Sequence, residues 1–241
     1  MAIPSRTGFP LRQVRFVLKP TRKRGEDIME HRELNLSRRG FAGAALAAGA
    51  LGAAGLKAAD GHVALTPSSD MGPFYPIERI AEEDADLTWI KGHSQRALGN
   101  VIEVSGRVLD RHGNPVSGAT LELWQCNSVG RYAHAADIAT APLDPNFQGF
   151  AAIRTGKAGE WHITTIKPSG YDSPIGKRTP HIHFDVRGKS HRLIAQMYFE
   201  DDHATNSTDE LYKTLGRDAL HSVAKLAAPT KYNWDIVLMD G

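Results

Sequence analysis

Residues 119–126 read ATLELWQC, and this stretch decides the fold because its side chains divide between two faces when the chain is extended. Successive side chains of a strand point to opposite faces, so the two leucines and Gln125 would share one face and Trp124 the other. Further stretches of this kind follow turn signals at residues 101–109, 150–154, 160–166, 181–187, 193–199 and 234–239. Roughly seven short strands with frequent turns predict an all-β fold, specifically a β-sandwich of the transthyretin type.

The segments outside these strands suggest little other regular structure. Leucines recur loosely within residues 208–226, which predicts one short helix there and at most two in the chain. Residues 60–98 contain TPSSDMGPFYP at 66–76, too rich in Pro and Gly for a helix or a central strand. We expect this segment to be an N-terminal arm that Leu87 and Trp89 dock onto a β-sandwich domain at residues 99–241.

Residues 36–60 read LSRRGFAGAALAAGALGAAGLKAAD, with Arg38 and Arg39 preceding a weakly apolar run. This run is too short and too poor in large apolar residues to span a bilayer well. The pattern is typical of a twin-arginine secretion signal over residues 1–59. We therefore expect export of the folded protein to the periplasm or beyond by the twin-arginine machinery, with Met29 as a possible true start and no membrane attachment after cleavage.

The basic residues are concentrated in the same N-terminal region. Residues 1–59 contain 11 Lys or Arg and 4 acidic residues, which leaves 18 basic and 23 acidic residues, a net charge of −5. Nucleic-acid binding requires a basic face, so we expect no nucleic-acid partner. Cys126 is the only cysteine, which excludes an intramolecular disulfide. The 41% apolar content suffices for an ordinary core.

Residues 178–184 read RTPHIHF and contain the first candidate metal ligands. In a strand, His181 and His183 would point to the same face, where their imidazoles could bind one metal. A His-x-His pair alone is more often an ordinary surface pair, but Pro180 makes a routine central-strand role less plausible. Asp185 continues the alternation and could serve as a third ligand, although three positions on one strand form a poor facial set.

Neither a Cys cluster nor a His-Glu-x-x-His motif accompanies the pair, so an ordinary zinc site would lack ligands. Two tyrosines are the other candidates, because Tyr132 and Tyr171 both lie in predicted loops of the kind that carry ligands on a rigid sandwich. A phenol ionises at about pH 10, so a tyrosinate at neutral pH requires a strong Lewis acid. Iron(III), which is hard and highly charged, would satisfy that requirement.

Several motifs, in the same order along the chain, are similar to those of the intradiol ring-cleavage dioxygenases, and most of all to the protocatechuate 3,4-dioxygenase type. They are LELWQCNSVGRYAH at 121–134, PLDPNF at 142–147, TIKPSGY at 165–171, RTPHIHF at 178–184 and QMYFE at 196–200. GPFYP at 72–76 and WDIVL at 234–238 extend the resemblance to both ends of the region from residue 66 to the C-terminus.

The resemblance implies an enzyme that opens catechol-type rings with O2 at a non-haem iron(III) centre and gives cis,cis-muconate-type products. Carried over position by position, it implies that the iron ligands are Tyr132, Tyr171, His181 and His183. It also implies that Arg178 is an active-site arginine, that Gln196 lines the substrate pocket and that Trp124 lies near the site. Tyr171 would be the ligand that leaves when the substrate binds.

Three questions stay open on the sequence alone. Asp172-Ser173-Pro174 follows Tyr171, where protocatechuate enzymes often carry an aromatic residue, so the choice among catechols is undecided. Residues 104–119 also resemble transthyretin-like binding modules without catalytic function, and the histidine pair could serve an iron(II) or copper enzyme instead. The protocatechuate type often pairs related chains, so a homo-oligomer or hetero-oligomer is possible.

Overall fold

The computed structural model describes residues 61–78 and 82–241, which all belong to the second of two compact units, Leu51–Gly241. The predicted secretion signal at residues 1–59 lies outside the described residues. Within the described part, no helix combines the length and the apolar character that a membrane span requires. Residues 61–98 contain turns and isolated bridges but no named strand or helix, apart from the undescribed residues 79–81.

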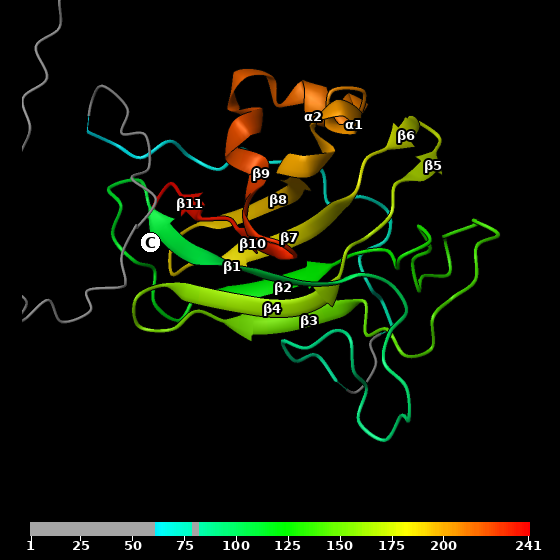
Figure 1. The fold of residues 1–241 in the computed structure, drawn as a ribbon. Helices are drawn as coiled ribbons and strands as arrows, with labels where there is room; N and C mark the ends of the chain where they lie inside the picture. The colour runs from blue at the N-terminus through cyan, green and yellow to red at the C-terminus, as the bar shows by residue number, and fades with distance from the viewer. Residues whose placement is uncertain (1–60, 79–81) are drawn as a thin grey trace, which may run out of the picture. The chain divides into compact units, whose positions relative to one another are not determined.

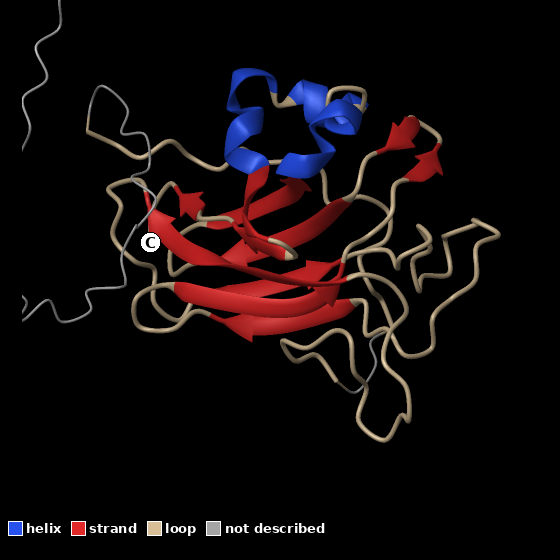
Figure 2. Ribbon diagram, in the orientation of Figure 1, coloured by secondary structure: helices blue, strands red, loops and turns tan. Residues whose placement is uncertain are grey.

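Strands make up most of the regular secondary structure in the described residues, and long loops connect them, as Figure 2 shows. The strands are β1 (Val101–Asp110), β2 (Thr120–Trp124), β3 (Phe150–Arg154), β4 (Glu160–Ile166), β5 (Tyr171–Ser173), β6 (Gly176–Arg178), β7 (His181–Arg187), β8 (Arg192–Phe199), β9 (Val223–Ala228), β10 (Lys231–Asn233) and β11 (Ile236–Leu238). The helical segments are the 3-10 turns η1 (Glu200–Asp202) and η2 (Gly216–Ser222) and the α-helices α1 (His203–Asn206) and α2 (Glu210–Thr214).

One large sheet has the order β11-β1-β10-β9-β8-β7-β2-β3, with β4 paired to β1 (Figure 1). The strands β5 and β6 form a separate hairpin between β4 and β7. Residues 83–87 nearly close the sheet, because Ala152 N of β3 donates to Glu83 O and Thr164 N of β4 donates to Ala85 O. The arm therefore supplies hydrogen-bond partners to two strands that do not pair with each other.

The prediction of an all-β chain with at most two short helices is confirmed for the described residues. The predicted strands are present, but the structure adds β5, β6, β9 and β10, most of them only three residues long. Such short strands carry too few alternations to be recognised in a sequence. The helix expected within residues 208–226 is shorter than that range, because η2 and the start of β9 occupy its second half.

The alternation predicted for residues 119–126 is confirmed by the burial of β2. Leu121 and Leu123 lie in the main hydrophobic core, whereas Trp124 and Cys126 belong to a second cluster with Tyr132. Of the two residues expected to dock the arm, Leu87 is fully buried in the main core, but Trp89 is 37% exposed. Trp89 instead lies beneath the Arg96 guanidinium, 5.3 Å from the ring centroid.

The burial of Leu87 yields a test of whether the arm is part of the folded unit. We expect Leu87→Ala to lower the free energy of unfolding by about 2–5 kcal/mol, because it leaves a cavity in the main core. Ile77→Ala is the matched control in the same arm, since Ile77 is 83% exposed, and should change stability by less than about 0.5 kcal/mol. Urea unfolding measures both, and equal small effects would show that the arm folds independently of the core.

Candidate metal centre

The β7 strand places His181 and His183 on one face of the sheet, as the alternation predicts. Each side chain is 1% exposed, and the two Nε2 atoms lie 3.2 Å apart. The Nδ1 atom of His181 lies 2.6 Å from Thr179 O. A carbonyl can only accept, so Nδ1 carries the proton and Nε2 is left with a free lone pair, the form that binds a metal.

The orientation of the His183 ring is set largely by stacking, because its Nδ1 has no hydrogen bond among the described residues. Its ring lies on Trp124, with the centroids 4.9 Å apart and the planes 7° from parallel. This contact follows from the register, because Trp124 of β2 is paired directly with His183 of β7. Burial is the main cause that lowers the pKa of His181 to about 3 and that of His183 well below its usual range. Both imidazoles are therefore neutral at pH 7 and available as ligands.

The two tyrosines named by sequence lie beside this pair. The Tyr171 hydroxyl is 3.5 Å from His181 Nε2, and the Tyr171 ring meets the Tyr132 ring edge-on with centroids 5.5 Å apart. The Tyr132 hydroxyl is buried and has no hydrogen-bond partner in the described part of the chain. Burial also raises the pKa of Tyr132 well above its usual range. A buried phenol without a partner is costly, and a strongly Lewis-acidic metal would relieve that cost.

The donor set fits a hard, highly charged cation better than the alternatives. Among residues 61–78 and 82–241, no group of three or more His, Cys, Asp or Glu could hold a metal ion. Asp185, considered above as a third ligand, is instead bound by Arg187 and by both Nε and Nη2 of Arg192. Two imidazoles and two phenol oxygens therefore remain, and anionic oxygen is a ligand type that iron(III) prefers.

The hairpin β5–β6 explains how Tyr171 reaches the histidines. Tyr171 is the first residue of β5 and pairs with Arg178, the last residue of β6. The prediction that Tyr171 lies in a loop was wrong. Tyr171 is in a strand, since all three residues of β5 pair with β6. The pairing holds Tyr171 next to the strand that begins with His181. A tyrosine in an unpaired turn would have no such fixed position.

Arg178 and Gln196 lie in direct contact. Arg178 is 5% exposed, and its Nη2 donates to Gln196 Oε1 at 2.6 Å. Gln196 Nε2 in turn donates to Asp70 O at 2.8 Å, which fixes the amide. Gln196 is also the direct partner of His183 in the pairing of β7 with β8. The Arg178 guanidinium is therefore bound to the residue that is paired directly with His183.

Sequence reasoning missed three contributors to the site. Tyr198 donates its hydroxyl to Gln196 Oε1 at 3.1 Å. Phe74 stacks on Tyr132 with centroids 4.6 Å apart. Gly72 approaches His183 so closely that a Cβ there would lie 3.1 Å from His183 Cε1. Phe74 and Gly72 belong to the Gly-Pro-Phe-Tyr-Pro motif of the arm. The motif alone did not indicate that they contact Tyr132 and His183.

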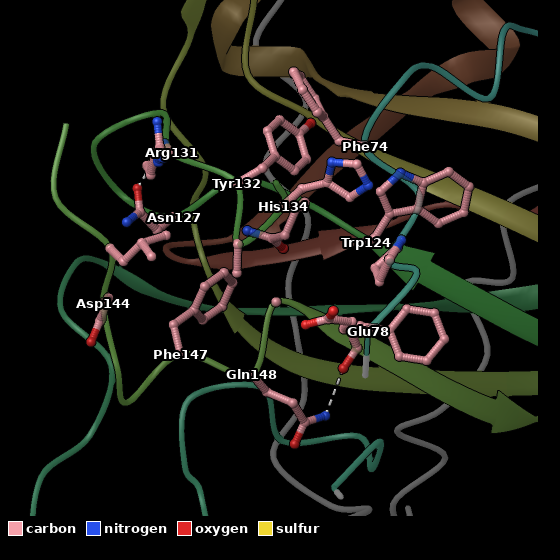
Figure 3. A pocket seen from close by; sticks show the side chains of 16 residues that line it. Phe74, Glu78, Trp124, Asn127, Arg131, Tyr132, His134, Asp144, Phe147 and Gln148 are labelled. Atoms are coloured by element: carbon pink, nitrogen blue, oxygen red, sulfur yellow. Dashed lines mark hydrogen bonds between the residues drawn. The ribbon is translucent and has the colours of Figure 1, made fainter. Parts of the chain in front are cut away.

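A pocket lies beside Tyr132, as Figure 3 shows. Of the predicted site residues, only Tyr132 and Trp124 line it, together with residues that include Phe74, Phe147 and Gln148. His181, His183, Tyr171 and Arg178 do not line it. This hollow therefore adjoins the candidate metal centre without containing the imidazole pair.

A family model described as Dioxygenase matches residues 71–240, well over half of the chain. The protocatechuate 3,4-dioxygenase beta chain of Burkholderia cepacia is 42% identical over 135 residues, which cover 54% of this chain and 57% of that protein. This chain belongs to the intradiol ring-cleavage dioxygenase family. Members of this family are non-haem iron(III) enzymes, which agrees with the donor set above.

Other relatives of this intradiol family member give the same assignment. Catechol 1,2-dioxygenase of Candida albicans is 31% identical over 165 residues, covering 61% of this chain and 51% of that protein. The chain thus spans little more than half the length of these two curated relatives. The solved structure of an intradiol ring-cleavage dioxygenase from Tetranychus urticae superposes with a TM-score of 0.57 at 18% identity, covering 73% of this chain and 94% of that one. At that identity the likeness shows the shared fold.

Gly72 allows the packing of His183 to be tested in this dioxygenase. We expect Gly72→Ala to reduce bound iron by roughly tenfold or more, because the new methyl group would displace the imidazole or the arm. Gly118→Ala is a matched control, since Gly118 has a similar φ of 74° against 72° but nothing within 4 Å of its would-be Cβ. Metal analysis after purification from iron-supplemented medium compares the two. Equal iron loss in both variants would attribute the effect to backbone strain alone.

Proposed function

We propose that this protein is an iron(III)-dependent intradiol dioxygenase that cleaves catechol-type rings between the two hydroxyl-bearing carbons, using both atoms of O2 to form cis,cis-muconate-type diacids. One observation carries the proposal. Two buried neutral imidazoles with their Nε2 atoms 3.2 Å apart share a site with Tyr171, 3.5 Å away, and with the unpartnered hydroxyl of Tyr132. We assign these four residues as the iron ligands.

When bound, iron(III) accepts the two catechol oxygens and makes the ring reactive toward O2 without an external reductant. Of the two tyrosines, we propose that Tyr171 withdraws when substrate binds and that its oxygen takes a proton from a substrate hydroxyl. Their packing supports this choice. Tyr132 is 3% exposed and stacks under Phe74, whereas Tyr171 is only half-buried and belongs to a three-residue strand.

Arg178 is suited to stabilise negative charge that develops on the ring during oxygen addition. Its side chain is buried, and its Nη1 has no hydrogen bond within the described residues, so that donor is available to a ligand. A fixed cation acts more strongly in a dry site, because the charge does not have to compete with water. Gln196 orients Arg178 through the 2.6 Å contact and lines the same side of the imidazole pair.

The substrate class is a catechol, and we leave the ring substituent open. Relatives carry the names protocatechuate, catechol and hydroxyquinol dioxygenase. The residues after Tyr171 supply Asp172 and Ser173 in β5 rather than an aromatic wall, so we do not propose a preference for carboxylated rings. O2 uptake with a panel of these three substrates would decide among them.

We also propose that the sheet folds into two packed layers of the transthyretin type. The main core contains side chains from β1 and β4 as well as from β2, β7 and β8, which is the arrangement that two facing layers would produce.

Substitutions at the ligands and at Arg178 should separate metal binding from turnover. Iron-loaded protein should be wine-red because of charge transfer from tyrosinate to iron(III). Tyr132→Phe or His183→Ala should abolish the colour or the iron content. Arg178→Ala should keep both and lower kcat by roughly 100-fold or more, as loss of one electrostatic donor does elsewhere. Visible spectra, iron analysis and O2 uptake provide the measurements.

The same experiment addresses the rival functions. A colourless protein that contains iron would refute the tyrosine ligands. A yellow semialdehyde product would indicate extradiol cleavage at the histidine pair. Protein that retains no metal would favour a non-catalytic transthyretin-like module.

We propose export by the twin-arginine route, supported by Arg38 and Arg39 and by the apolar run that follows them. Replacing both arginines with lysine should leave unprocessed precursor in the cytoplasm, because the pathway requires the arginine pair. Immunoblots of cell fractions measure this, and processing that continues unchanged would contradict the proposal. The relatives include the beta and the alpha chain of protocatechuate 3,4-dioxygenase of Burkholderia cepacia, so we further propose that the mature protein forms an oligomer, to be tested by its size in solution.

A further inference from the structure

Asp209 is a fully buried carboxylate that joins the helical segment to the candidate active site. Its exposed fraction is 0%, and it immediately precedes α2. Its Oδ1 accepts hydrogen bonds from the backbone N–H groups of Leu211 and Tyr212, at 2.9 and 3.2 Å, which caps the helix. Its Oδ2 accepts from Arg178 Nε and from Thr179 N, both at 2.9 Å. One side chain therefore satisfies four donors.

These contacts fix the direction of the Arg178 guanidinium. Asp209 holds its Nε and Gln196 holds Nη2, so two nitrogens of the planar group are anchored. Among the described residues, Asp209 is the only carboxylate that forms an ion pair with Arg178. The contacts with Asp209 and Gln196 involve Nε and Nη2, the atoms along one edge of the guanidinium. A buried guanidinium without its anion would be costly and free to turn toward other acceptors.

The same carboxylate also positions the start of β7. Thr179, whose N–H it accepts, provides the carbonyl that binds His181 Nδ1 at 2.6 Å. The Thr179 hydroxyl further contacts Thr205 and Asn206 of α1. The segment that carries both Arg178 and His181 is therefore tied to the short helices through buried polar contacts.

We propose that Asp209 is a positioning residue for the ring-cleavage reaction, acting through Arg178 by holding its guanidinium beside the imidazole pair. The expected effect on turnover rests on the proposed dioxygenase function. The placement of Arg178 by Asp209 does not depend on it. Asp209 has no role in holding the metal, because its oxygens are occupied by the four donors.

The test is Asp209→Asn in the iron-loaded protein. Asparagine can still cap α2 through its carbonyl oxygen, but its NH2 group cannot accept from Arg178 and Thr179. We expect iron content and the charge-transfer band to persist while kcat/KM falls roughly 10- to 100-fold, mainly through kcat because Arg178 acts on developing charge. Glu210→Gln is the control, since this neighbouring acid forms an exposed ion pair with Lys213.

A double-mutant cycle decides whether Asp209 acts through Arg178. In an Arg178→Ala background, Asp209→Asn should cause no further loss of kcat/KM. Multiplicative losses, or unchanged kcat/KM in the single variant, would overturn the proposal. If Asp209→Asn fails to fold, Asp209→Ser keeps a capping hydroxyl that is too short to hold Arg178 and enters the same cycle.

A crystal structure of the Asp209 variant gives a readout that does not depend on activity. We expect the Arg178 guanidinium to leave its position beside Gln196 while His181 and His183 stay in place. An unmoved Arg178 would refute the inference even if turnover fell. Conversely, a wild-type protein that cleaves no catechol would refute the proposed function, and the displacement of Arg178 would still decide the role of Asp209.

Discussion

Two imidazole nitrogens face each other 3.2 Å apart in a region closed to solvent, and the rest of the structure serves to keep them there. Burial, and to a lesser extent the nearby charge of Arg178, lowers the pKa of both rings, so both remain neutral. The two Nε2 atoms lie within hydrogen-bond distance of each other, but this single contact does not fix the planes of the rings. Their orientation is imposed from outside, by the Thr179 carbonyl on one ring and by the Trp124 stack on the other.

That arrangement explains why the surrounding residues come from distant parts of the chain. The sheet supplies the two rings and Gln196 through direct strand pairing. The hairpin β5–β6 supplies Tyr171 and Arg178 as a cross-strand pair. The arm supplies Phe74 against Tyr132 and a glycine at which a Cβ would lie only 3.1 Å from His183 Cε1. Each of these segments contributes a few side chains, and the candidate metal centre forms only when all of them are packed together.

The sequence predicted the parts that follow from local periodicity. Alternation along β7 was enough to place His181 and His183 on one face, and the alternation along β2 placed Trp124. Tyr132 and Tyr171 needed the family pattern, since a loop tyrosine carries no periodic signal. Asp209 could not have been found, because it lies 31 residues from Arg178 and its partners are fixed only by tertiary packing. The same reason hid the close approach of Gly72 to His183.

The contacts of the arm have a consequence for the order in which the protein can fold. Asp70 meets Gln196 across 126 positions, and Thr66 meets the backbone of Val237 across 171. Contacts of such long sequence separation are slow to form, because the entropy of closing the loop is lost before the contact is gained. A growing chain in which Val237 has not yet been synthesised cannot form the contact between Thr66 and Val237. This contact therefore forms only after all four candidate ligands, which lie between residues 132 and 183, have been synthesised.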